Sequence, residues 1–304
     1  MKQAENIVNI VGTLSEVDIK TGVSKKTNKE YISGVIKIRT SETIDGTDYE
    51  LEVPVRLFAT KLTNKGQLNP AYRSIEDLQK LTSLQAAEDE SLADKIEIEN
   101  GEIISNDYCN RNGDLVTSAA IRTSFYKKVT GDYRPCATFN NVIVVGNIKD
   151  ELDKEGIETG RLIISGIIPQ YGDKVDVVPF IVEKKSSADF IRSHWKKGDT
   201  VRIAGVVKFS YKVDTQKVDD IGFGEPVYKQ KTTSVREFII KSGSQGCLDE
   251  KWCYSEEDIH TALKNRAAYH EEVRNNYQQR AAAAAAPTVS ATDSDSFEDI
   301  GSMF

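Results

Sequence analysis

Basic and aromatic side chains alternate along several predicted strands and along the loops between them. Lysine and arginine can track phosphates while aromatic rings stack on bases, so this mixture suits an unpaired nucleic-acid strand. In the first half of the chain the candidates are Lys25, Lys26, Lys29, Tyr31, Lys37, Arg39, Arg56, Phe58, Arg122, Tyr126 and Lys128. In the second half they are Arg202, Lys208, Lys212, Phe223, Tyr228, Lys229 and Lys231.

Strand periodicity predicts that most of these candidates face outward. In residues 31–40, Lys37 and Arg39 have the opposite parity to the isoleucines, and residues 49–58 repeat this pattern with Arg56 and Phe58. Tyrosines in strands usually pack, and exposed lysines usually only solvate a face. The prediction of a nucleic-acid surface therefore rests on all the candidate residues together rather than on any one of them, because the loops and strands that carry them are expected to converge on one surface.

No pattern of residues indicates catalysis. Thr159-Gly160-Arg161 lacks the rest of a phosphate-binding loop, and the chain has no G-x-S-x-G or H-E-x-x-H. Its 3 histidines form no recognisable constellation, and Cys247 and Cys253 are spaced more widely than a typical zinc pair. We expect no enzyme activity, no cofactor and no metal site. A metal-dependent nuclease is the least favoured alternative.

The elements that would position the candidates recur in two halves of the chain. Motifs in the same order are Ile10–Leu14 with Val144–Ile148, Ser33–Ile36 with Ser165–Ile168, Val53–Val55 with Val178–Phe180, and Asp94–Ile98 with Asp199–Ile203. Five strands, with a helix between the third and the fourth, are the order of an OB-fold, a small barrel that often binds nucleic acid. The repeat therefore predicts a long binding surface more readily than one catalytic pocket.

We predict the elements by residue range. In the first half, strands are expected at 7–14, 31–40, 49–58, from 95 onward with a bulge at Asn100-Gly101, and at 115–129, with a helix at 74–87 capped by Ser74. In the second half they are expected at 141–148, 161–168, 174–182, 200–213 with a bend at Gly205, and 233–241 after a polar loop at 214–231; the helix is at 187–196. A further helix follows Ser255 and stops at Pro287.

The predicted fold is mainly β: two OB-fold-like five-stranded barrels, a C-terminal helix and a disordered acidic tail. We divide the 304 residues into modules at 1–140 and 141–245, a linker and helix at 246–287, and a tail at 288–304. The formal net charge is −7, and the segment after 245 carries 11 acidic against 5 basic residues. Because the modules are nearly neutral, a nucleic-acid groove must be a local stripe of cations.

Composition also bears on the compartment. No apolar run approaches the roughly 18 residues of a membrane span, and the first residues contain no apolar segment typical of a secretion signal. The 4 scattered cysteines are interpreted as free thiols. We expect a cytoplasmic protein with no membrane partner.

The tail has its own chemistry. Acidic residues alternate with apolar ones, and a phenylalanine ring ends beside the terminal carboxylate; the residues are Asp293, Asp295, Phe297, Glu298, Asp299, Ile300 and Phe304. Such a peptide can insert its ring into a partner's pocket while basic residues receive its carboxylates. The alternative is an ordinary solvated acidic tail.

With two modules and this tail, the chain resembles single-stranded DNA-binding proteins, particularly those of tailed phages. The resemblance covers the modules, about residues 7–241, and the tail from Asp293 to Phe304. Bacterial members usually carry one barrel and a proline before the final phenylalanine, whereas this chain has two modules and Gly301-Ser302-Met303. The resemblance implies a protein that coats and protects single-stranded DNA in replication and recombination, in the cytoplasm of a bacterial host.

The resemblance also implies its partners. They are single-stranded DNA and replication or recombination proteins recruited through the tail, and a homo-oligomer is left open. The alternative function is a tandem β-barrel scaffold for protein interactions without nucleic-acid binding, because barrels of this kind serve many functions.

Overall fold

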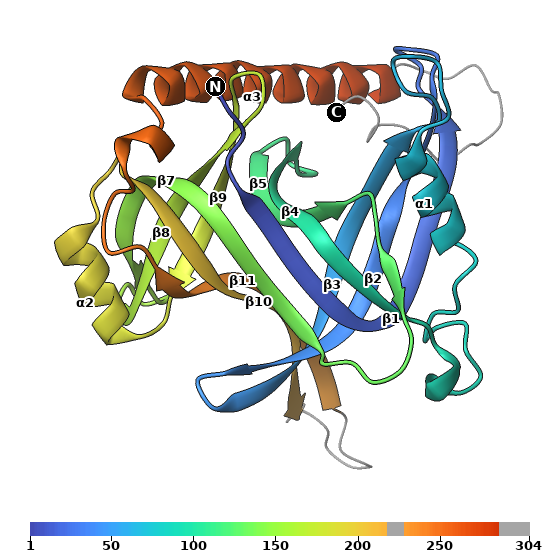
Figure 1. Ribbon diagram of the computed structural model, residues 1–304, viewed down its shortest axis with the longest axis horizontal. Helices are drawn as coiled ribbons and strands as arrows, with labels where there is room; N and C mark the ends of the chain where they lie inside the picture. Colours follow the sequence, from blue (N-terminus) through green and yellow to red (C-terminus); the bar gives the residue numbers. More distant parts are fainter. Residues whose placement is uncertain (218–227, 286–304) are drawn as a thin grey trace.

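The first barrel is a closed sheet that contains the predicted alternation. The computed structural model, which describes residues 1–217 and 228–285, forms this barrel from β1 (Asn6–Val23), β2 (Glu30–Ile44), β3 (Thr47–Thr60), β4 (Lys95–Cys109) and β5 (Leu115–Thr123) (Figure 1). The strands pair in the order β1-β2-β3-β5-β4, and β4 returns to β1. Ile36, Ile38, Val53 and Val55 are fully buried inside, because alternate residues of a strand face the same side.

The second barrel repeats this pairing. It consists of β7 (Cys136–Leu152), β8 (Glu158–Gln170), β9 (Lys174–Val182), β10 (Thr200–Lys217) and β11 (Tyr228–Gly243). The order is β7-β8-β9-β11-β10, and β10 returns to β7. The predicted fold class, a mainly β chain with two OB-fold-like barrels, is therefore confirmed. The division at residue 140 stays a prediction, since β7 begins at Cys136 and also pairs with β1.

Two strand predictions need correction. The segment 115–129 is not one strand: β5 ends at Thr123, and a short β6 (Lys127–Val129) pairs with the start of β4. The segment 214–231 is not wholly a loop, because β10 and β11 continue their ladder as far as the pair Lys217–Tyr228.

The helix after β3 begins and ends earlier than predicted. Helix α1 (Pro70–Leu78) is capped by Asn69, whose side chain accepts a hydrogen bond from the Ala71 amide, rather than by Ser74. Proline suits the first helical position because it needs no amide donor there. Beyond α1, the Leu84 amide donates to the Leu14 carbonyl, so this stretch follows the barrel wall instead of continuing the helix.

A long C-terminal helix crosses both barrels. Helix α3 (Glu256–Ala285) begins as predicted after Ser255, whose Oγ accepts from the Asp258 amide at 3.1 Å. Ile259 and Ala262 pack against the second barrel, and Arg266 reaches the first. Figure 1 shows α3 above both barrels. The remaining helices are the short η1 (Glu90–Leu92) and η2 (Glu250–Trp252), and α2 (Lys185–His194), which follows β9.

The barrels are joined strand to strand with approximate two-fold symmetry. β1 and β7 pair antiparallel over six residues, from Asn6–Asn141 to Val11–Cys136, with Val8 opposite Phe139. On their other edges, Val8 pairs with Gly101 and Phe139 pairs with Gly205. Val8 and Phe139 therefore hold the same position in their barrels, and the symmetry axis passes between them.

This register also refines the comparison of the repeats. Thr13 pairs with Lys95, and Val144 pairs with Thr200, so the equivalence of the segments after Asp94 and Asp199 makes Thr13 the counterpart of Val144. The predicted match of Gly12 with Gly146 is therefore displaced by about three residues. The register of β1 with β2 shifts between Leu14 and Glu16, and that of β7 with β8 shifts between Val145 and Ile148.

Candidate nucleic-acid interface

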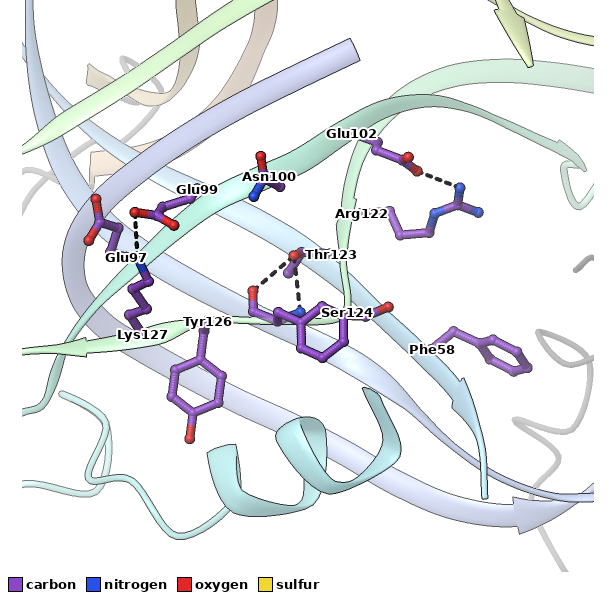
Figure 2. Close-up of a pocket in the computed structure, with 11 residues that line it drawn as sticks. Phe58, Glu97, Glu99, Asn100, Glu102, Arg122, Thr123, Ser124, Tyr126 and Lys127 are labelled. Atoms are coloured by element: carbon purple, nitrogen blue, oxygen red, sulfur yellow. Dashed lines mark hydrogen bonds and ion pairs between the residues drawn. The ribbon is translucent and has the colours of Figure 1, made fainter. Parts of the chain in front are cut away.

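The most promising surface is a hollow at one end of the first barrel, which we call the β5 pocket. It has a volume of about 510 Å³ and is open to solvent. Its lining comes from the end of β3, the first half of β4, the end of β5 and the link to β6 (Figure 2): Phe58, Glu97, Glu99, Asn100, Glu102, Arg122, Thr123, Ser124, Phe125, Tyr126 and Lys127. Predicted candidates Phe58, Arg122 and Tyr126 thus meet in one place.

Three aromatic residues line the β5 pocket. Phe125 is 58% exposed, and its backbone is fixed by Thr123, whose Oγ1 donates to the Phe125 carbonyl at 3.0 Å. Phe58 stacks on Tyr31 with ring centroids 5.8 Å apart. Burial raises the pKa of the Tyr126 hydroxyl, so this ring is neutral and partly covered. An exposed ring held by its backbone can stack on a base at little entropic cost.

Tyr31 itself is not open to a base. Its side chain is buried, and its hydroxyl lies so close to Gly22 that a β-carbon there would be 2.7 Å from it. The sequence predicted a stacking ring, but Tyr31 instead forms the support on which Phe58 rests.

Two cations of the β5 pocket are paired with carboxylates. Nη2 of Arg122 lies 2.7 Å from Glu102, and Nζ of Lys127 lies 2.6 Å from Glu99. Figure 2 shows these two pairs on opposite sides of the pocket. Nearby, Lys128 contacts Asp94 at 2.6 Å. Partly exposed pairs of this kind are worth little, so a phosphate can compete for the cation.

Arg56 brings a positive charge next to Arg122. The two residues are neighbours across the β3–β5 ladder. Burial and the charge of Arg236 lower the pKa of Arg56, and Arg236 belongs to β11 of the second barrel. Within the described part of the chain, no ion pair involves Arg56. This site between the barrels therefore carries positive charge that a phosphate could neutralise.

The β1–β2 loop adds three exposed lysines, Lys25, Lys26 and Lys29. The loop adjoins the end of β3, because Tyr31 pairs with Thr60 and the Lys61 amide donates to the Glu30 carbonyl. These lysines are therefore at the same end of the barrel as Phe58. The outward-facing cations of β2 are further along the strand and paired: Lys37 with Glu16 at 2.6 Å and Arg39 with Glu90 at 3.1 Å.

In the second barrel the predicted cations are placed differently. Lys208 is only 15% exposed; its Nζ contacts Glu183 at 3.3 Å and lies 4.6 Å from the centre of the Tyr49 ring. It therefore fastens the β2–β3 hairpin to the second barrel rather than lining an open groove. Arg202 contacts Glu5 at 2.7 Å, again across the junction of the barrels.

Several predicted residues lie outside the described side chains. Phe223 falls in the gap between 217 and 228, and the tail residues lie beyond 285. For Lys212, Tyr228, Lys229 and Lys231 only the strand is described. The continuous path over both modules therefore stays a prediction.

Comparison with known proteins identifies the family. The model of the YorF family matches residues 4–276. The chain belongs to the YorF family. No curated protein matches it.

Two solved structures are similar to this YorF-family chain at low TM-scores. A deletion mutant of the single-stranded DNA-binding protein from Thermus aquaticus has a TM-score of 0.47 and 12% identity, over 84% of this chain and 98% of that one. The wild-type protein has a TM-score of 0.46 and 11% identity, over 80% of this chain and 93% of that one. At TM-scores below 0.5, neither likeness supports a conclusion about this chain.

The YorF-family chain has a second hollow, beneath α3, of about 620 Å³. It lies over the outer faces of β8 and β9, and Arg266 and His270 of α3 form one wall. Arg266 is held by Asp107 at 2.7 Å and by Ser105 Oγ at 2.7 Å. Helix α3 thus covers part of the face that corresponds to the β2–β3 face of the first barrel.

Two site residues of the YorF-family chain escaped the sequence analysis. Phe125 was passed over because it lies in a break between strands that was predicted to be continuous. Arg236 was passed over because its proximity to Arg56 depends on how the two barrels meet. In the described ranges, no group of three metal-ligating side chains comes together, and no helix is long and apolar enough to cross a membrane.

Proposed function

We propose that this chain is a non-enzymatic protein that binds single-stranded DNA. The single observation that supports this most is the β5 pocket, in which an exposed phenylalanine and two further rings lie beside Arg122 and Lys127. Bases can stack on these rings, each stack being worth about 1–3 kcal/mol. Phosphates can be held by the β1–β2 loop lysines and by Arg56 and Arg236.

The proposal extends to the role and the partners of the protein. We propose that it coats and protects single strands during replication or recombination, without enzyme activity of its own, in a phage-infected bacterial cell. The acidic tail, from Asp293 to Phe304, would recruit replication or recombination proteins and compete with DNA for the basic surface. Removing 293–304 should tighten DNA binding and abolish partner capture; no change in either would exclude the tail mechanism.

The binding test uses the full chain and a fluorescent oligo(dT) at several salt concentrations. Affinity should fall steeply with salt, because phosphate contacts release counterions. Replacing Lys25, Lys26 and Lys29 together by glutamine should lower the slope of log K against log salt by about 2, since each single-strand contact contributes about 0.7. The matched control replaces Lys174, Lys196 and Lys197, exposed lysines of the second barrel that do not line the β5 pocket.

The second candidate function is a protein-interaction scaffold. One observation favours it: many predicted cations already have acidic partners, among them Lys37, Arg39, Arg122 and Lys208. A scaffold would bind no oligonucleotide. It would still bind its partner proteins after charge reversal of the β1–β2 loop lysines. A DNA-binding protein would lose affinity.

A further inference from the structure

The β5 pocket contains more acid than a general strand-binding surface requires. Glu97, Glu99 and Glu102 of β4 all line it, together with Asn100. Two of these carboxylates are occupied, Glu99 by Lys127 at 2.6 Å and Glu102 by Arg122 at 2.7 Å. The third carboxylate, that of Glu97, determines which ligand group the pocket can accept.

Glu97 is left without such a partner. It is opposite Lys127 in the β4–β6 ladder, but Nζ of Lys127 turns to Glu99 instead. Among the described residues, the Glu97 carboxylate makes no hydrogen bond and no ion pair, although the charge of Lys127 still acts on it from a longer distance. Figure 2 shows it beside the Glu99–Lys127 pair. A half-buried carboxylate that makes no hydrogen bond is a strong acceptor that cannot donate.

We infer that the β5 pocket selects bases that carry an exocyclic amine, and that Glu97 reads this amine. The inference rests on the proposed function. A base stacked on the pocket rings presents its edge to the lining. Cytosine, adenine and guanine each have an exocyclic N–H₂ group that can donate a hydrogen bond to a carboxylate. Thymine has a single N–H on this edge, and carbonyl oxygens lie on both sides of it. Those oxygens would face the negative charge of Glu97.

The expected discrimination is modest. Large discrimination between bases comes from bidentate contacts, whereas a single contact between Glu97 and an amine in an open pocket contributes less. Cytosine should therefore bind about fivefold more tightly than thymine, which corresponds to about 1 kcal/mol.

The test compares oligo(dC) with oligo(dT) of equal length, at mildly alkaline pH so that cytosine strands do not pair with themselves. The full chain should prefer oligo(dC) by about fivefold. Glu97→Gln keeps the shape of the side chain but adds a donor that thymine O4 can accept, so the preference should shrink toward equality. Loss of the negative charge also strengthens binding to both strands, so the ratio of affinities is the measurement.

The matched control is Glu50→Gln, an exposed glutamate of β3 that does not line the pocket. It removes the same charge and should leave the ratio unchanged. Equal affinity for both strands in the wild-type protein, or an unchanged ratio in Glu97→Gln, would overturn this inference while leaving DNA binding intact. Failure to bind either strand would instead defeat the proposed function.

Discussion

At the scale of single residues, Gly205 shows how closely the second barrel is packed. A β-carbon at this position would lie 1.9 Å from the Ile239 carbonyl oxygen and 2.8 Å from Cζ of Phe139. The first contact is with backbone, which cannot rotate away. The absence of a side chain at Gly205 is therefore a condition for β10 to pair with both of its neighbours.

We expect Gly205→Ala to lower the free energy of unfolding by about 3 kcal/mol, the upper end of the usual cost of overpacking. Urea unfolding followed by circular dichroism measures this. The control is Gly246→Ala, where the nearest atom is the His194 carbonyl oxygen at 3.9 Å and the change should stay within about 0.5 kcal/mol. Equal effects in the two variants would contradict the close approach at β10.

Asp176 gives a prediction about pH. Burial raises its pKa above 3.8, although its Oδ1 accepts hydrogen bonds from the amide and hydroxyl of Ser105. The folded protein therefore holds this proton more tightly than the unfolded chain does. The resulting stabilisation is complete below pH 3.8 and is lost as the pH rises through the raised pKa of Asp176.

The Asp176→Asn variant lacks this titration but can still accept from Ser105. Relative to wild type, we expect its free energy of unfolding to improve as the pH rises from 3.8 to neutrality. Denaturant unfolding of both proteins across that range is the measurement. A difference that is constant, or that moves the other way, would show that the carboxyl is not penalised by burial.

At the scale of elements, α3 is anchored by a buried ion pair between the barrels. The side chains of Arg266 and Asp107 are 10% and 2% exposed, and the guanidinium also reaches the Val175 carbonyl of β9. Removing one partner of such a pair leaves an uncompensated buried charge. The anchor therefore ties α3 to a strand of each barrel.

We expect Arg266→Leu to speed hydrogen exchange in α3 from residue 266 onward by more than tenfold, because the helix loses its buried ion pair with β4 and keeps only weaker contacts there, such as that of His270 with Asp107. Mass-spectrometric exchange of backbone amides measures this, and the barrels serve as an internal reference. Arg274→Leu is the control, since Arg274 is 45% exposed and, among the residues that the structure describes, pairs with Glu271 of the same helix alone. Similar exchange in both variants would mean that apolar contacts alone hold α3.

Most strands and helices of this chain, but few contacts between distant segments, could be predicted from the sequence. Strand alternation and the recurring motifs predicted both barrels, and the Ser255 cap predicted the start of α3. The start of α1 was missed because Asn69-Pro70 competes with Ser74 as a cap, and the observed hydrogen bond decides between them. At the site, parity predicted that Arg122 faces outward, but its pairing with Glu102 depends on the β4–β5 register. Such pairings between distant segments are not readable from local patterns.

At the scale of the whole molecule, the β1–β7 pairing makes the barrels depend on each other. The first half of β1 pairs with β4 on one edge and with β7 on the other. Separating the barrels would leave both β1 and β7 with exposed, unpaired backbone groups, and such edges recruit other strands.

We therefore expect a separately produced piece, residues 136–285, to self-associate. Its free β7 edge can pair with a second copy about the same axis that relates the barrels in the intact chain. Analytical ultracentrifugation measures this, with the intact chain as reference. Adding residues 1–134 should replace the self-association by a one-to-one complex. A monomeric piece with an intact second barrel would contradict the prediction.

The two barrels are related by approximate two-fold symmetry, but their two outer ends differ in sequence. In a dimer of identical chains, symmetry would force both ends to be alike, but here one polypeptide supplies both halves and each end has evolved its own side chains. The β1–β2 turn is cationic, whereas its counterpart between β7 and β8 contains Asp153 and Glu155 against the single Lys154. If the chain binds a single strand as proposed, that strand would meet unlike ends, and one direction, 5′ toward one end and 3′ toward the other, would be favoured.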